Sequence, residues 1–158
     1  MLLLISLTLC ACGFQLRGSA SLPKAMNTTF IQSSNPTGLF TRELSLLLEA
    51  NGVDVVDTMS EGAARLVIAD ERITRRPLTV SADARVREFE LVFDLRFSLL
   101  AADGSVLIEP ETLRLAREFQ FDEQEILGAA SEEELLREDL RRNMAATLVR
   151  RLEAFGRS

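Results

Sequence analysis

The chain has 158 residues and a formal net charge of −6, which is long enough for a domain with its own core and too acidic for a general nucleic-acid binder. Its 18 cationic residues are all arginine except Lys24, and arginine suits forked contacts with carboxylates and phosphates. The chain contains no histidine, which excludes Ser-His-Asp and Cys-His catalytic arrangements.

An uncharged apolar run, MLLLISLTL, opens the sequence and precedes its 2 cysteines. This run is too short to span a membrane, and it fits the apolar region of a secretory signal; a short buried strand or helix start is the alternative. Leu9 to Cys12 resembles a bacterial lipobox, with Leu9 and Ala11 at its aliphatic and small positions. The resemblance implies a signal peptide over residues 1–11, cleavage before Cys12, and covalent N-acyl and S-diacylglycerol groups (palmitate-type chains) on Cys12.

Glycine, serine and proline with little periodicity predict an extended lipidated tether over residues 12–27. The β-rich run TTFIQS predicts a strand at 28–33. A helix is expected over LFTRELSLLLEANG, because Phe40, Leu44 and Leu48 fall on one face. A short extended piece at 53–56 and a strand over 65–73 follow.

Strict alternation in REFELVFDLRFSLL predicts a strand with one apolar face, formed by every second residue from Phe89 to Leu99. Asp103 and Gly104 predict a hairpin turn, with a partner strand returning after it. Ser131 and Glu134 form a capping box and predict the start of the last helix. The apolar face of that helix comprises Leu136, Leu140, Met144, Leu148, Leu152 and Phe155.

Two amphipathic helices and a sheet with one apolar face can bury each other. The sequence therefore predicts one α+β domain over residues 28–156. Its expected architecture is a two-layer sandwich, with two helices packed on one face of a mixed four-stranded sheet.

The order of these pieces resembles the LptE family, the RlpB-like lipopolysaccharide-assembly lipoproteins of Gram-negative outer membranes. The resemblance is carried by CGFQLRG after the lipobox, a helix ending in NGV, the segment RPLTVSADARVREFEL, and REFQFD before a terminal helix that contains RRLEAF. Gln15 stands where histidine is common in the family, and it is assigned no role.

The resemblance implies a protein that is not an enzyme and needs no cofactor beyond its lipid. It implies a complex with the LptD β-barrel, in which the lipoprotein is plug and assembly factor, helps to move lipopolysaccharide into the outer leaflet and binds it. The expected location is the outer membrane, lipid-anchored on the periplasmic side and reaching into the barrel lumen.

Two other functions remain open. One is an auxiliary lipoprotein adaptor of another envelope transport complex. The other is a small periplasmic hydrolase that uses carboxylates, which would need a concave pocket with two converging acidic side chains. No metal site and no catalytic residue are predicted.

The segment from residue 72 to residue 88 is the candidate binding site, because it is basic within an acidic chain. If one strand ends at Ile73 and the next begins at Val86, its arginines gather at one end of the sheet, where they could hold lipopolysaccharide phosphates. A solvated loop with weak ion pairs and contact with the barrel wall are the alternatives. The predicted lipopolysaccharide-binding residues are Arg72, Arg75, Arg76, Arg85 and Arg87.

Overall fold

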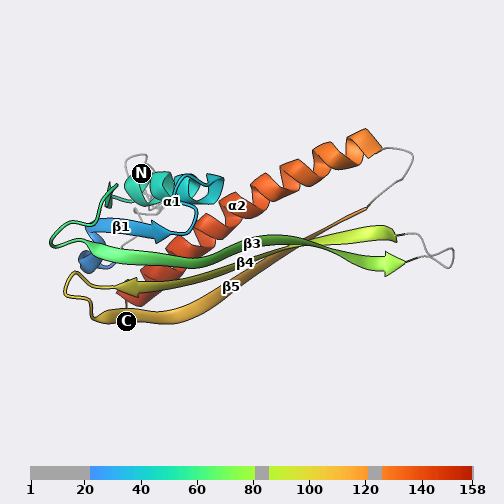
Figure 1. Ribbon diagram of the computed structural model, residues 1–158. Coiled ribbons are helices and arrows are strands. Elements are labelled where there is room, and N and C mark those ends of the chain that lie inside the picture. Colours follow the sequence, from blue (N-terminus) through green and yellow to red (C-terminus); the bar gives the residue numbers. More distant parts are fainter. Residues whose placement is uncertain (1–21, 81–85, 121–125, 158) are drawn as a thin grey trace, which may run out of the picture.

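The computed structural model describes residues 22–80, 86–120 and 126–157 (Figure 1). The elements, in chain order, are η1 (Lys24–Met26), β1 (Thr28–Ser33), α1 (Leu39–Ala50), β2 (Asp54–Val56), β3 (Ala64–Val80), β4 (Val86–Leu100), β5 (Val106–Gln120) and α2 (Ile126–Gly156). The predicted α+β sandwich is confirmed, although the sheet has 5 strands and not four. The additional strand is β2, which forms where the sequence predicts only a short extended piece.

The sheet has the order β2-β1-β3-β4-β5, with β1 parallel to both of its neighbours and the remaining pairs antiparallel. β1 pairs with β3 only from Ala64 to Ile68, whereas β3 continues to Val80. Beyond Ile68 the sheet therefore narrows to β3, β4 and β5. These three strands extend away from α1 and β1 as a twisted arm, which we call the arm (Figure 1).

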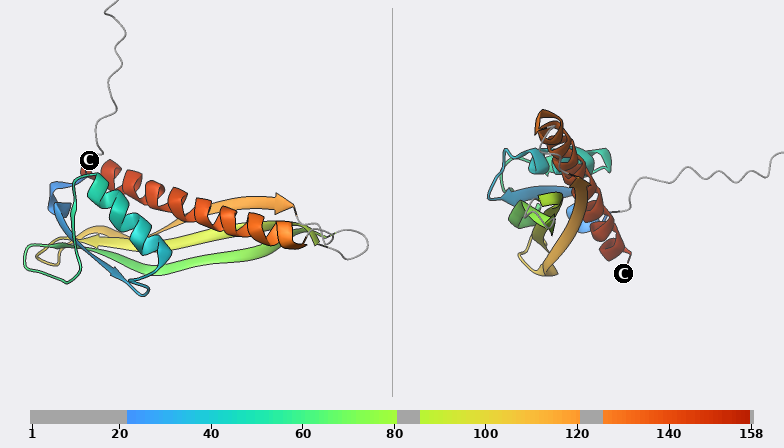
Figure 2. Two further views of the ribbon diagram at one scale, coloured as in Figure 1. Left: turned by 90° about the horizontal axis from the view of Figure 1, so that it is seen from above. Right: turned by 90° about the vertical axis from the view of Figure 1, so that its right-hand side faces the viewer.

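The core lies between the sheet and the two helices, which cover the same face of the sheet (Figure 2). Every second residue of β4 from Leu91 to Leu99 is fully buried, as the alternating pattern predicts. Phe93 meets Phe40 of α1 edge-on, with 5.4 Å between ring centroids. The buried side chains that α2 contributes include Leu140, Met144, Leu148 and Leu152.

The segment just before β1 also contributes to the core. Met26 of η1 is fully buried, and its carbonyl oxygen accepts a hydrogen bond of 2.7 Å from the buried Thr29 hydroxyl. The hairpin predicted at Asp103 and Gly104 is confirmed: Gly104 has a φ of 85°, and the Ala101 amide donates to the Ser105 carbonyl oxygen at 2.8 Å.

The helix start predicted from the capping box is wrong. α2 begins at Ile126, so Ser131 and Glu134 lie inside the helix. The preceding residues include good helix formers, and Ala129 is buried, so packing and propensity favour a longer helix over a cap at Ser131. Within the described residues, no helix combines the length and apolar character that crossing a membrane requires.

Candidate functional site

The arginines of β3 lie within a strand and not in a loop. The expectation that the strand ends at Ile73 is wrong, because β3 pairs with β4 throughout this region. Arg75 stands opposite Leu91, whose side chain is in the core, and Arg76 stands opposite Glu90. Successive side chains of a strand point to opposite faces. Arg75 is thus on the helix side of the sheet, and Arg72 and Arg76 are on the outer face.

Arg75 contacts side chains of both the sheet and α2. Its guanidinium carbon lies 3.5 Å from the centroid of the Phe89 ring, and Phe89 stacks on Phe119 of β5 at 5.8 Å. Its Nη1 atom lies 3.1 Å from Oε2 of Glu133 on α2. A guanidinium over an aromatic face and beside a carboxylate is held by two attractive interactions. Arg75 therefore fastens α2 to the arm.

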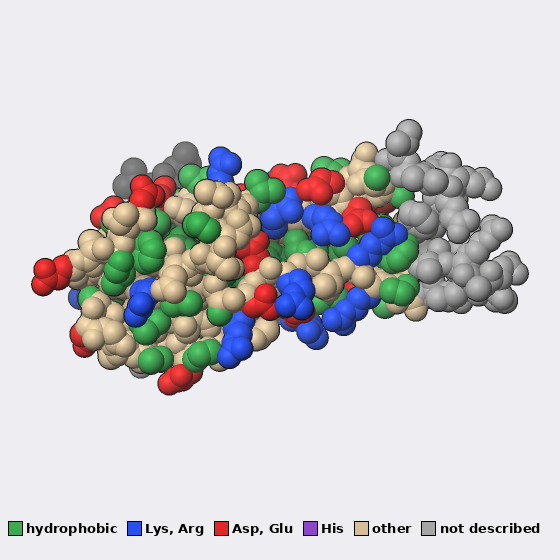
Figure 3. Space-filling view, in the orientation of Figure 1, with side chains coloured by type: hydrophobic (Ala, Val, Ile, Leu, Met, Phe, Trp, Pro, Cys, Tyr) green, Lys and Arg blue, Asp and Glu red, His purple; other side chains and the backbone are tan. Residues whose placement is uncertain are grey.

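Further charged side chains continue this contact along α2. Glu133 also accepts a hydrogen bond of 2.7 Å from Arg137, and Arg141 donates one of 3.0 Å to Glu134. Glu71 of β3 stands opposite the core residue Leu95, on the helix side, where the charge of Arg141 acts on its carboxyl group. We call these residues, together with Arg75, the helix-side seam. In Figure 3 basic side chains flank a hydrophobic strip in the middle of the molecule, where α2 and β3 face each other.

Glu71 is the member of the helix-side seam whose charge is least well compensated. Its Oε2 atom is buried and has no hydrogen-bond partner among the described residues. Burial raises the pKa of this carboxyl group, and the positive charge of Arg141 only partly opposes the rise. The seam therefore contains a carboxylate that is costly to keep ionised.

A second cluster lies on the outer face of the arm. Asp94 of β4 stands between Arg72 and Arg114 in the strand register, and Arg114 Nε donates to Asp94 Oδ1 at 2.6 Å. This hydrogen bond lowers the pKa of Asp94, helped by the charges of Arg114, Arg76 and Arg72. We call Arg72, Arg76, Asp94 and Arg114 the outer-face cluster. Two more carboxylates border these guanidinium groups, because Glu90 stands opposite Arg76 and Asp70 pairs with exposed Arg72 at 3.4 Å. An additional anion would therefore have to displace exposed ion pairs, which are weak.

The remaining predicted site residues fall outside what the structure describes. Arg85 and Cys12 lie outside the described residues, and Arg87 lies in β4 without a described side chain. Arg114 was missed, because its position beside Asp94 depends on the β4–β5 register. The sequence contains only a weak signal for this contact: Asp94 is a polar position in the alternating β4 pattern, and the strand that follows the hairpin contains an arginine, Arg114.

Two other site classes find no support in the described parts of the chain. No group of three or more acidic, cysteine or histidine side chains there could hold a metal ion. A cavity beside α1 contains Asp57 as its only acidic side chain, and a smaller one near the 101–103 turn contains only Asp103. Neither cavity offers the two converging carboxylates that the hydrolase alternative requires.

Comparisons with known proteins agree with this architecture. The structure superposes on the solution structure of a lipoprotein B from Nitrosomonas europaea with a TM-score of 0.77, 31% identity, and coverage of 92% of this chain and 94% of that one. The crystal structure of the rare lipoprotein B from Shewanella oneidensis has the same fold, with a TM-score of 0.70 at 20% identity over 80% of this chain and 94% of that one.

Sequence relatives extend the comparison. The LPS-assembly lipoprotein LptE of Photorhabdus laumondii is 29% identical over 141 residues, which cover 89% of this chain and 76% of the relative. The protein of the same name from Pectobacterium atrosepticum is 27% identical over 142 residues, or 89% of this chain and 76% of that one. The family model "LptE: Lipopolysaccharide-assembly" matches residues 26–152, and the chain therefore belongs to the LptE family of lipopolysaccharide-assembly lipoproteins.

Proposed function

We propose that the protein forms a complex with the LptD β-barrel, fills its lumen as plug and assembly factor, and takes part in moving lipopolysaccharide into the outer leaflet. Its family consists of non-enzymatic lipoproteins of lipopolysaccharide assembly, so the protein acts by binding and not by turnover. Cys12 would carry the lipid that anchors it on the periplasmic side of the outer membrane.

The observation that carries this proposal is the charged surface of the arm. The lumen of an outer-membrane barrel is polar, so a plug needs a surface of polar side chains with their charges paired. The outer face supplies such pairs, with Arg114 on Asp94 at 2.6 Å and Arg72 near Asp70 at 3.4 Å. The arm therefore has the surface that insertion into a polar lumen requires.

We place lipopolysaccharide phosphates at the outer-face cluster, with Arg72 and Arg76 as ligands and Arg114 beside them. The ion pair of Arg72 with Asp70 is long and exposed, which makes it easy to exchange for a phosphate. Arg75 is less available, because Phe89 and Glu133 already hold it. Arg85 and Arg87 remain predicted ligands.

The complex is tested by pulling down the tagged full-length protein from its native envelope in mild detergent. We expect mass spectrometry to recover a large outer-membrane barrel in near-equal amount, together with an N-terminal peptide acylated at Cys12. An acylated protein without a barrel would contradict the LptD proposal and favour an adaptor of another envelope complex.

The lipopolysaccharide site is tested by the double variant Arg72→Glu with Arg76→Glu. Because two charge-assisted contacts become repulsive, binding of purified lipopolysaccharide should weaken by about tenfold or more. The free energy of unfolding should fall by about 1 kcal/mol, because the new carboxylates stand opposite Asp94 and Glu90. Binding is therefore compared at a temperature at which circular dichroism shows the variant to be folded. Arg150→Glu on α2 is the matched control, and equal binding by the double variant and this control would refute the assignment.

A further inference from the structure

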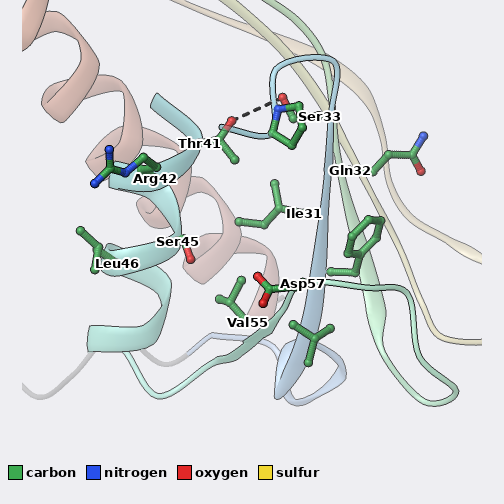
Figure 4. Close-up of a pocket in the computed structure, with 12 residues that line it drawn as sticks. Ile31, Gln32, Ser33, Thr41, Arg42, Ser45, Leu46, Val55 and Asp57 are labelled. Carbon is green, nitrogen blue, oxygen red and sulfur yellow. Dashed lines mark hydrogen bonds between the residues drawn. The ribbon is translucent and has the colours of Figure 1, made fainter. Parts of the chain in front are cut away.

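The edge of β1 is open beyond the point at which β2 ends. β2 pairs with Thr28 to Phe30 and stops at Val56, whereas β1 continues to Ser33. Among the described strands, only β3 pairs with Ile31 to Ser33. In Figure 4 the chain leaves the line of β2 at Asp57. No strand formed by the described residues continues β2 beside Ile31 to Ser33, and an open strand edge is a template for another extended chain.

A cavity of about 590 Å³ lies at this vacant position, between β1 and α1. Ile31 and Val55 line the cavity on the strand side, and Ser45 of α1 points toward them from the helix side, while Leu46 points outward at the rim (Figure 4). Leu46 is 64% exposed and adds apolar surface at the rim of the cavity. A groove between a strand edge and a helix is long and narrow, and this shape suits an extended peptide.

The two ends of the groove carry opposite charges. Arg42 lies next to Thr41, whose hydroxyl group is 3.4 Å from that of Ser33 at the end of β1. Asp57 lies at the other end, directly after the last residue of β2. Neither side chain forms an ion pair with any part of the chain that the structure describes. Within the described residues, the groove thus has a guanidinium group at one end and a carboxylate group at the other, neither of them in an ion pair.

We propose that this β1-edge groove binds an extended peptide segment of a partner protein, which continues the position of β2 and runs parallel to β1. Its backbone pairs with Ile31 to Ser33, and its apolar side chains cover the partly exposed Val55 and the exposed Leu46. A carboxylate near its C-terminal end meets Arg42, because that end of a chain parallel to β1 lies beside Ser33. This site is remote from the arm, and it does not depend on the function proposed above.

The probe is a peptide selected from a random heptapeptide phage library on the immobilised full-length protein in detergent micelles. We expect enriched sequences with alternating apolar residues and an acidic residue near the C-terminal end. The synthetic labelled peptide should bind in fluorescence anisotropy, and it should protect the amides of Ile31 to Ser33 from hydrogen exchange. Failure to enrich any sequence, or protection confined to other strands, would overturn the proposal.

Two variants distinguish binding of the peptide in the groove from nonspecific binding elsewhere on the protein. Arg42→Glu removes the carboxylate partner and should weaken binding of the selected peptide by about tenfold. Ser45→Trp fills the groove from a partly exposed helix position and should abolish binding with an unchanged circular dichroism spectrum. Arg150→Glu, which lies away from the groove on α2, should bind as the parent does. If Arg42→Glu and Ser45→Trp bound the peptide as tightly as Arg150→Glu, the peptide would dock elsewhere and the proposal would be wrong.

Discussion

Alternation along a strand decides what each arginine of β3 can do. Arg75 and Arg76 are neighbours in the sequence, yet one faces α2 and the other faces outward. A single rigid ligand on one face of the sheet therefore contacts only one of them. Arg75 joins Phe89 and Glu133 across the helix-side seam, whereas Arg76 belongs to the outer-face cluster.

The two arginines should therefore differ in their contribution to stability. Arg75→Ala removes a cation–π contact and an ion pair, so we expect it to lower the free energy of unfolding by about 1 kcal/mol. Arg76→Ala should change it by less than about 0.5 kcal/mol. Urea denaturation measures both values. Equal values for the two variants would contradict the fastening role of Arg75.

Glu71 should make the stability of the protein depend on pH in an unusual direction. Its folded-state pKa is raised above the ordinary 4.5, so ionised Glu71 costs stability above the folded pKa, and protonation relieves that cost as the pH falls. We expect Glu71→Gln to melt at a higher temperature than the parent at pH 7, with a difference that shrinks toward pH 4.5. Thermal melts across this range measure the effect.

Asp94 serves as a control, because its pKa is shifted in the opposite direction to that of Glu71. Its folded-state pKa is lowered below the ordinary 3.8 by the hydrogen bond from Arg114, so its contribution is present above pH 3.8 and is lost as the pH falls further. Asp94→Asn should therefore melt at a lower temperature than the parent at pH 7. A Glu71→Gln variant that also melts lower at pH 7 would show that the Glu71 carboxylate is stabilising.

At the scale of elements, the sequence predicts best where one face is apolar and the other polar. The alternation in β4 and the helical face of α2 both correspond to buried stripes, and both are confirmed. The second half of β3 has no such alternation, because Arg72 and Arg75 on opposite faces are both charged. Only its pairing with β4 makes this segment a strand, and pairing is not visible in a single segment.

The same limit applies to the candidate site. Composition identified Arg72, Arg75 and Arg76 as a basic group, but the loop that it presumed does not exist there. With the correct strand end, the division of these arginines between two faces follows from their numbers alone. The contributions of Arg114 and Glu133 depend on strand register and on where α2 crosses the sheet, and long-range packing sets both.

The contact between α1 and β4 offers a test at this scale. Phe93 is fully buried against the edge of Phe40, so Phe93→Ala leaves a cavity between the two layers and should cost about 3–5 kcal/mol. Val106→Ala is the matched control, because Val106 is 51% exposed, and it should cost far less. Guanidinium denaturation measures both variants, and similar losses would contradict this assignment of the core.

The molecule as a whole has two parts. We call the two-layer part, which contains α1, β1, β2 and the first half of β3, the base; in the arm, β3 lacks one of its two neighbouring strands. Between Leu66 and Ile68, β3 is flanked by β1 and β4, whereas between Arg72 and Arg76 it is flanked only by β4. We expect native-state hydrogen exchange to show stronger protection in the first group than in the second, because the arm can open without breaking the base. Uniform protection along β3 would indicate that base and arm unfold together.

The bare edge of β3 also affects how the protein behaves on its own. An unpaired strand of this length invites pairing with a second copy, which is the first step of aggregation. Charged side chains of both signs follow this edge, from Asp70 to Arg76, and Pro77 removes one backbone donor. Charged side chains and a proline on an edge strand oppose such pairing. Replacing Arg72, Arg75 and Arg76 with valine should therefore increase aggregation of the free protein, which light scattering measures.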